Sequence, residues 1–129
     1  MAHKAHLLVI DDDANTLASL ARAFRLAGHE ATVCDTAARA LELIKAQRFD
    51  LILSDVNMPH ATGFELLMRI KSDPRLKPVP VVLITGTTPQ DTIADHALAI
   101  GATKFLRRPI DSSVLLQEIE SCLEAARGK

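Results

Sequence analysis

The chain has 129 residues, of which 48% are hydrophobic, and this length and composition suit one domain with a single core. Fifteen basic and sixteen acidic residues give a formal net charge of -1, and 3% of the residues are aromatic, so we expect no direct binding of nucleic acid. No apolar stretch approaches the roughly 20 residues of a membrane span, and the segment Met1 to His6 does not suit a signal peptide, so we expect a cytoplasmic protein without membrane contact.

Short apolar runs alternate with amphipathic stretches along the chain. This alternation is typical of βαβ units, in which parallel strands form one sheet and helices cover both of its faces. The runs without polar residues suit strands that are buried on both faces. Strands are expected over residues 7–10, 30–35, 51–54, 81–84 and 103–106.

Each expected strand is followed by a segment with apolar residues at helical spacing. The first of these segments carries Leu17, Ala21 and Phe24 on one face, and the last helix is expected from about Ser112 to Ala126. The expected helix starts are the caps Asp13, Thr36, Thr88 and Asp111, together with Gly63 as the first residue of the third helix. The pattern predicts an α/β fold with a doubly wound, five-stranded parallel sheet and five helices in three α/β/α layers. We expect a single domain over residues 1–129 with its core at about residues 6–126.

Acidic residues follow two of the apolar runs at the point where each strand ends. Asp11 and Asp12 follow the first strand, and Asp55 follows the third. Because the carboxyl ends of parallel strands meet at one edge of a sheet, we expect these side chains to converge. Carboxylates at close range repel one another unless their pKa values rise or a hard cation lies among them. The sequence therefore predicts a magnesium site, although the acidic pair alone would also suit a solvated first turn of a helix.

A set of short motifs occurs in one order along the chain. The motifs are Asp11-Asp12, the segment from Ser54 to Pro59 around Asp55, Gly63, Thr85-Gly86, and a basic residue before Pro109. With these motifs the chain resembles the receiver domain of bacterial response regulators over about Leu7 to Leu123. The resemblance implies a flavodoxin-like fold and identifies Asp55 as the expected phosphoacceptor. The phosphoryl group would come from a sensor histidine kinase, a phosphotransfer protein or a small acyl phosphate.

The resemblance also implies the ligands of the magnesium ion. Mg²⁺ would be held by the carboxylates of Asp11, Asp12 and Asp55 and by the backbone carbonyl of Asn57. Magnesium prefers six oxygen ligands and keeps several waters, which a half-open acidic site allows. The metal and a nearby cation would offset the charge of the phosphoryl group during transfer. The chain would thus assist its own phosphoryl transfer and dephosphorylation without being an enzyme.

Further positions are implied to respond to the phosphoryl group. Thr85 would donate a hydrogen bond to a phosphoryl oxygen, and Gly86 would leave the group accessible. Phe105 matches an aromatic residue that moves between exposed and inward rotamers, although a phenylalanine in a short strand equally suits core packing. Pro109 is expected to follow a cis peptide bond, the alternative being a surface proline ahead of a helix.

Arg108 departs from the family pattern, which has a lysine directly before this proline. An ammonium is a compact point charge, whereas a guanidinium is a wider planar fork. We therefore expect that Asp55 is phosphorylated but that the coupling from phosphate to the output face is altered. In the alternative, Arg108 points to solvent and Lys104 does not contribute to the site.

Two functional interpretations follow from these residues. The leading one is a phosphorylation-switched signalling module that acts on a downstream effector or a fused output domain. Its rival is a phosphorylation-independent, receiver-like docking module in which Arg108 has disabled the switch. A phosphatase with an aspartate nucleophile is disfavoured because Asn57 stands where a second acid is needed, and a flavin-binding protein is disfavoured because acids follow the first strand.

The last helix and the two cysteines suggest less specific roles. Leu115, Ile119 and Cys122 form an apolar stripe, which suits either a homodimer interface or a buried terminal helix. Cys34 and Cys122 lie in no metal-binding or redox spacing, so we expect reduced, structural thiols.

Overall fold

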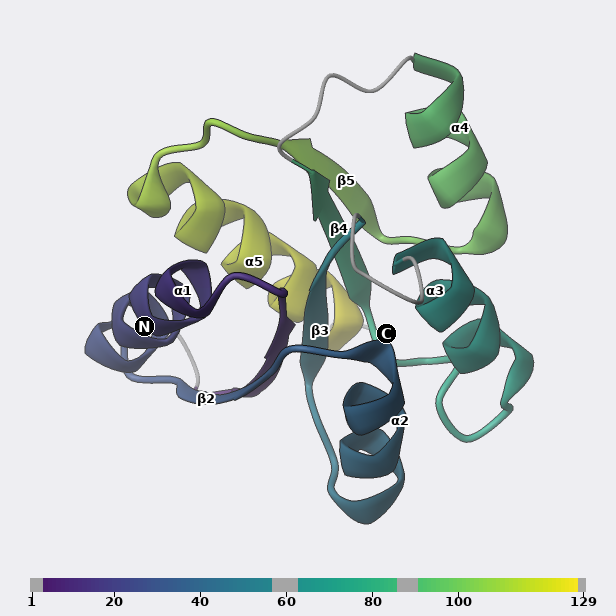
Figure 1. The fold of residues 1–129 in the computed structure, drawn as a ribbon, viewed down its shortest axis with the longest axis horizontal. Helices are drawn as coiled ribbons and strands as arrows, with labels where there is room; N and C mark the ends of the chain where they lie inside the picture. Colours follow the sequence, from purple (N-terminus) through teal and green to yellow (C-terminus); the bar gives the residue numbers. More distant parts are fainter. Residues whose placement is uncertain (1–3, 57–62, 86–90, 128–129) are drawn as a thin grey trace.

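The computed structural model describes residues 4–56, 63–85 and 91–127 (Figure 1). Strands and helices alternate along these residues, as the sequence predicts. The elements are β1 (His6–Ile10), α1 (Ala14–Leu26), β2 (Glu30–Cys34), α2 (Ala37–Ala46), β3 (Leu51–Asp55), α3 (Gly63–Ser72), β4 (Val81–Thr85), α4 (Asp91–Ile100), β5 (Lys104–Arg107) and α5 (Ser112–Arg127). Among the described helices, none combines the length and the apolar character that crossing a membrane requires.

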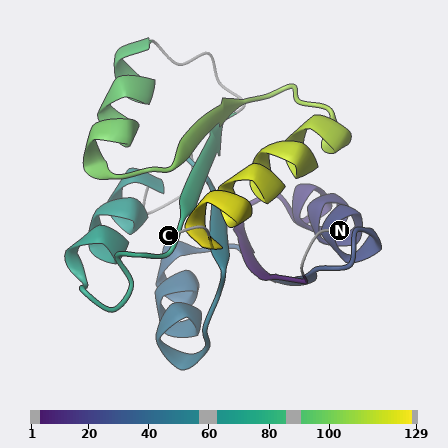
Figure 2. The same ribbon diagram turned by 180° about the vertical axis from the view of Figure 1, so that it is seen from behind.

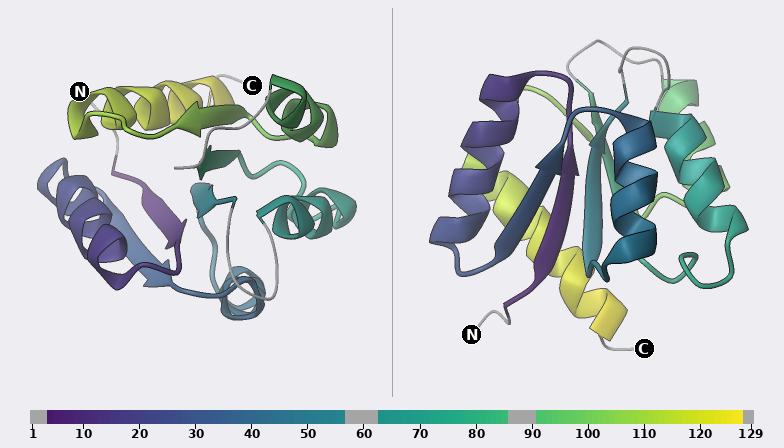
Figure 3. Two further views of the ribbon diagram at one scale, coloured as in Figure 1. Left: turned by 45° about the horizontal axis from the view of Figure 1, so that its top comes forward. Right: turned by 60° about the horizontal axis from the view of Figure 1, so that its bottom comes forward.

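All five of these strands are parallel and form one sheet in the order β2-β1-β3-β4-β5. In the right-hand view of Figure 3 the arrows of β1 and β2 point the same way, and the parallel pairing of these strands places their carboxyl ends at one edge of the sheet. The predicted doubly wound α/β sheet is confirmed. β3 and β4 extend one residue further than predicted and therefore include Asp55 and Thr85, while β5 begins one residue later.

The sheet separates two apolar cores. Helices α1 and α5 lie side by side over one face, and α2, α3 and α4 cover the other (Figures 2 and 3). Alternate residues of each central strand point into opposite cores because successive side chains of a strand face opposite ways. In β3, for example, Ile52 belongs to the core under α2 to α4, whereas Leu51 and Leu53 belong to the core under α1 and α5. Burial on both faces explains why the strands read as unbroken apolar runs.

Polar side chains cap α1 and α2 where the sequence predicts them. The Asp13 carboxylate accepts hydrogen bonds from the Asn15 amide (3.3 Å) and the Thr16 hydroxyl (2.6 Å), and the latter bond in particular lowers the pKa of Asp13. The Thr36 hydroxyl accepts a bond from the Arg39 amide at 3.1 Å. Asp111 lies directly before α5, and its backbone carbonyl accepts a hydrogen bond from the Leu115 amide at 2.9 Å. The predicted cap Thr88 lies outside the described residues.

The stripe of apolar residues on α5 is buried. Leu115, Ile119, Cys122 and Leu123 pack into the core that α5 shares with α1, and Leu116 is half-buried against it. Among the apolar side chains of α5 for which burial is described, Val114 is the largest that is exposed. The buried terminal helix, which was the simpler of the two interpretations, therefore accounts for this stripe.

Both cysteines are buried free thiols. Burial raises the pKa of Cys34 from its usual 9.0 to about 11. Because the folded chain keeps this proton where the unfolded chain loses it, stability falls as the pH rises from about 9 to about 11.

In a Cys122→Ala variant, we expect iodoacetamide to alkylate Cys34 far more slowly in the native protein than in urea at pH 8. Equal rates in the two conditions would contradict the burial of this thiol.

Candidate functional site

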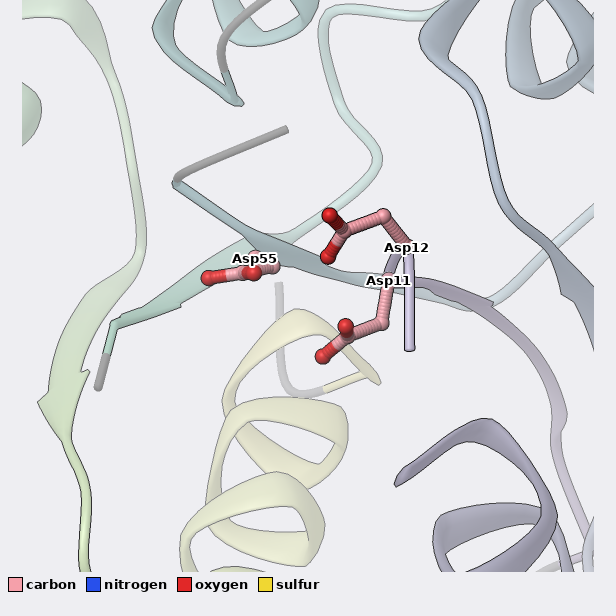
Figure 4. Close-up of side chains that lie close together, drawn as sticks. All are labelled: Asp11, Asp12 and Asp55. Atoms are coloured by element: carbon pink, nitrogen blue, oxygen red, sulfur yellow. The ribbon is translucent and has the colours of Figure 1, made fainter. Parts of the chain in front are cut away.

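Three aspartates meet at the carboxyl ends of β1 and β3. Asp11 and Asp12 follow β1 directly, and Asp55 is the last residue of β3. One carboxylate oxygen from each lies within 4.8 Å of the others, and Figure 4 shows the three side chains close together at this edge of the sheet. Asp11 and Asp55 are 2% and 7% exposed, whereas Asp12 is exposed. The predicted convergence of the acidic residues is therefore present in the fold.

The Asp11 side chain is held by two hydrogen bonds. Its Oδ1 accepts the backbone N–H of Asp13 at 2.9 Å, and its Oδ2 accepts Nη2 of Arg108 at 2.8 Å. The backbone amide of Asp11 donates to the carbonyl of Cys34 at 3.2 Å, which extends the pairing of β1 with β2 by one residue. The turn after β1 thus fixes the direction of this buried carboxylate.

The backbone on both sides of Asp55 is equally constrained. The Ser54 hydroxyl donates to the carbonyl of Asp55 at 3.0 Å, and the amide of Val56 donates to the carbonyl of Ile84 at 2.9 Å. The amide of Gly63 returns to the carbonyl of Val56 at 2.9 Å. A Cβ atom on Gly63 would lie 2.6 Å from the Asp55 carbonyl oxygen, closer than real Cβ contacts allow. Gly63 is therefore needed for close approach to the acidic site and not only for the start of α3.

Arg108 points into the acidic site. Its Nη2 lies 2.8 Å from Asp11 Oδ2, and its Nη1 lies 3.8 Å from Asp55 Oδ1. Its backbone amide donates to the carbonyl of Thr85 at 2.8 Å, which ties the residue after β5 to the end of β4. The alternative in which Arg108 points to solvent is wrong. Lys104, by contrast, pairs with Glu118 of α5 at 2.6 Å, and this contact raises the pKa of Lys104.

The remaining predicted positions are Thr85, Phe105, Pro109, Asn57 and Gly86. Thr85 is 1% exposed at the end of β4, in the strand that neighbours Asp55. Phe105 is half-buried and packs against the core under α2 to α4. The peptide bond between Arg108 and Pro109 is cis, as predicted. Asn57 and Gly86 lie outside the described residues.

The sequence did not predict a groove beside this site. It has a volume of about 570 Å³ and lies between α1 and the segment that joins β5 to α5. Its lining combines polar residues at the start of α1 with Arg108 and with apolar side chains, and includes Asn15, Thr16, Ser19, Leu20, Ile84, Ile110 and Leu115. In the sequence, the small polar residues Asn15, Thr16 and Ser19 of α1 suit an ordinary exposed helix face and do not indicate a groove.

The three carboxylates suit a hard divalent cation. Oxygen ligands in a partly solvated cluster are the donor set that Mg²⁺ or Ca²⁺ takes in proteins. Asp12 adds an exposed carboxylate beside the two buried ones, so water has access to one side of the cluster. The arrangement places carboxylate oxygens, a position for a cation and a guanidinium within one site.

Comparison with known proteins identifies the family. The sequence model of one protein family, the response regulator receiver domain, matches residues 7–120 of this chain. The chain is 31% identical to the chemotaxis protein CheY of Pseudomonas aeruginosa over 123 residues, which cover 95% of this chain and 98% of that protein. It is 35% identical to the 3',5'-cyclic-nucleotide phosphodiesterase regA of Dictyostelium discoideum over 124 residues, which cover 95% of this chain but only 16% of that protein.

A solved structure has the same fold. The chemotaxis response regulator CheY4 of Vibrio cholerae superposes with a TM-score of 0.86 at 29% identity, covering 93% of this chain and 99% of that chain. All three comparisons extend over nearly the whole chain. The chain therefore belongs to the response regulator receiver domains and is a receiver domain of a two-component signalling system.

Proposed function

We propose that this receiver domain accepts a phosphoryl group on Asp55 and thereby changes the surface that it presents to an effector. The observation that carries this proposal is the convergence of Asp55 with Asp11, Asp12 and Arg108 at one edge of the sheet. The matches to response regulators favour this function over a phosphorylation-independent docking module.

The proposed reaction is a direct phosphoryl transfer. A carboxylate oxygen of Asp55 forms a bond to phosphorus as the bond from phosphorus to the donor breaks. The donor leaves as the imidazole of a histidine kinase or phosphotransfer protein, or as the carboxylate of a small acyl phosphate. A carboxylate is a weak nucleophile, so its fixed position at the end of β3 and the neutralisation of charge around it must supply the rate.

Mg²⁺ is the cofactor that fits this reaction. Asp11, Asp12 and Asp55 would hold it, together with the backbone carbonyl of Asn57. When bound, the metal supplies positive charge that offsets the negative charge of the transferred phosphoryl group. Asp11 and Asp12 then have a defined task, which is to keep the cation beside the oxygen of Asp55 that reacts.

Thr85, Gly86, Arg108 and Phe105 are the proposed readout of the phosphoryl group. Thr85 lies in the strand next to Asp55, and the carbonyl of Thr85 holds the amide of Arg108. A hydrogen bond from the Thr85 hydroxyl to a phosphoryl oxygen would draw the end of β4 toward Asp55, with Gly86 leaving access to the phosphoryl group. Phe105 pairs with Leu83 of β4 in the sheet register, so a shift of β4 reaches this half-buried ring directly.

The partners are a phosphoryl donor and an effector or fused output domain. The groove between α1 and the segment after β5 shares Arg108 with the acidic site, so a donor protein seated there would bring its phosphoryl group near Asp55.

A homodimer through α5 would have to use its exposed side, which includes Val114. Light scattering with and without a phosphoryl mimic tests the dimer, and an unchanged monomer in both states would contradict it.

The chemical class of the adduct tests the proposed reaction. After incubation with Mg²⁺ and a small acyl phosphate, the protein should carry a phosphoryl group that neutral hydroxylamine removes. Hydroxylamine cleaves acyl phosphates but leaves phosphate esters of serine and threonine intact. A modification that resists hydroxylamine would place the phosphoryl group on a hydroxyl and would contradict the assignment to a carboxylate.

A further inference from the structure

We propose that Arg108 is a resident counter-ion of the acidic site and that a divalent cation binds there only by displacing its guanidinium. The inference rests on the proposed function, because it assigns a regulatory role to one residue of the same site. It concerns this chain in particular, since the family pattern has a lysine at this position.

The occupancy of Asp11 is the first observation. Both of its carboxylate oxygens already accept a hydrogen bond: Oδ1 from the amide of Asp13 at 2.9 Å and Oδ2 from Arg108 at 2.8 Å. The amide of Asp13 is fixed by the turn that starts α1, whereas the guanidinium ends a long flexible side chain. Each oxygen keeps a second acceptor direction, so the competition comes from charge: a cation on Oδ2 would lie close to the guanidinium that is held 2.8 Å from the same oxygen.

The span of the guanidinium is the second observation. Nη2 contacts Asp11 and Nη1 lies 3.8 Å from Asp55, so one planar group reaches two of the three carboxylates. The compact ammonium of a lysine has no such fork and concentrates its charge at one point. A dication placed among the same carboxylates would also repel the guanidinium at short range. Arginine should therefore compete with a metal ion for these carboxylates more strongly than lysine would.

The groove beside α1 provides an alternative position for the guanidinium of Arg108. The Arg108 side chain is 27% exposed and also lines the groove beside α1. The polar residues Asn15, Thr16 and Ser19 line that groove as well. Rotation of the side chain toward them would free Asp11 and Asp55 without burying the positive charge away from water. Metal binding and the position of Arg108 in this groove are therefore linked.

The test is the affinity for Mg²⁺, measured by titration calorimetry at constant ionic strength in the absence of any phosphoryl donor. We expect Arg108→Gln to bind Mg²⁺ at least about threefold more tightly than the unchanged protein, with Arg108→Lys between the two. Arg107→Gln is the matched control, because it removes the same charge from an exposed neighbouring position. An affinity for Arg108→Gln no tighter than that of the unchanged protein would overturn the inference. An equal gain in Mg²⁺ affinity in Arg107→Gln would also overturn the inference, because the loss of one positive charge would then explain the gain without any displacement of Arg108.

Thermal denaturation gives a second readout. Without metal, Arg108→Gln should melt at a lower temperature than the unchanged protein, because three carboxylates then repel one another without their counter-ion. Saturating Mg²⁺ should raise the melting temperature more in Arg108→Gln than in the unchanged protein. Equal Mg²⁺-induced shifts would contradict displacement. If Arg108→Gln does not fold without metal, the affinity of Arg108→Lys decides, and it must exceed that of the unchanged protein.

Failure of this inference can be told apart from failure of the proposed function. Competition between Arg108 and Mg²⁺ is read from binding alone, whereas phosphorylation of Asp55 is read from the mass of the protein. Tighter Mg²⁺ binding in Arg108→Gln, together with no phosphoryl adduct on the unchanged protein, would support the counter-ion role and refute phosphorylation. An adduct on Asp55 with unchanged Mg²⁺ affinity in Arg108→Gln would do the reverse.

Discussion

Replacement of Gly63 by alanine is expected to lower the free energy of unfolding by about 2 kcal/mol and to slow the phosphorylation of Asp55. The added Cβ would lie 2.6 Å from the carbonyl oxygen of Asp55 and 3.1 Å from the Cα of Val56. Both are backbone atoms, so neither can rotate away, and the end of β3 or the start of α3 must shift. Urea unfolding followed by far-ultraviolet circular dichroism measures the stability, and the rate of adduct formation measures the effect on the site.

Gly28→Ala is the control for the Gly63 variant. Gly28 has a positive φ of 94° but open space around a Cβ, and it lies after α1, away from the acidic site. A side chain in this backbone conformation costs roughly 1 kcal/mol, so this variant should lose stability without losing the rate of phosphorylation. Unchanged stability and rate in Gly63→Ala would contradict the close approach of α3 to Asp55.

Replacement of Asp12 by asparagine is expected to weaken Mg²⁺ binding at least about tenfold, with a matching loss of phosphorylation at limiting metal. Without metal, the same variant should be at least as stable as the unchanged protein, because one of three mutually repelling carboxylates is gone. Asp12 is exposed, so its replacement leaves no buried partner behind. Calorimetric titration measures the affinity, and thermal denaturation in a chelator measures the stability.

Asp13→Asn is the matched control for the Asp12 variant. It removes the same charge one residue further on, outside the cluster of three carboxylates, and asparagine caps helices as well as aspartate does. Mg²⁺ affinity should therefore change little. A loss of affinity as large as that of Asp12→Asn would show that the net charge near α1, and not ligation by Asp12, attracts the cation.

The sequence predicted the features that depend on strand order and strand ends. Once the apolar runs are identified as parallel strands, the position of Asp11, Asp12 and Asp55 at a common edge follows from the topology. The helix caps were predictable for a similar reason, because the bond from Thr36 to Arg39 depends only on neighbours within one turn. Local spacing and a single topological rule thus account for the architecture of the site.

The features that the sequence did not predict depend on distances between segments. The contact of Arg108 with Asp11 joins residues 97 positions apart, and a long side chain has many rotamers that do not reach the site. The close approach of Gly63 to Asp55 depends on the angle between α3 and β3, which no local pattern specifies. The apolar stripe of α5 was ambiguous because a stripe looks the same whether a core or a partner covers it.

The most direct test of the account is the intact mass of the protein after incubation with Mg²⁺ and a small acyl phosphate, beside an Asp55→Asn variant. We expect the unchanged protein to gain about 80 daltons, the mass of one phosphoryl group. The gain should disappear in Asp55→Asn and in the presence of a metal chelator. An equal gain in Asp55→Asn, or no gain at any time from seconds to minutes in the unchanged protein, would contradict the assignment of Asp55 as the phosphoacceptor.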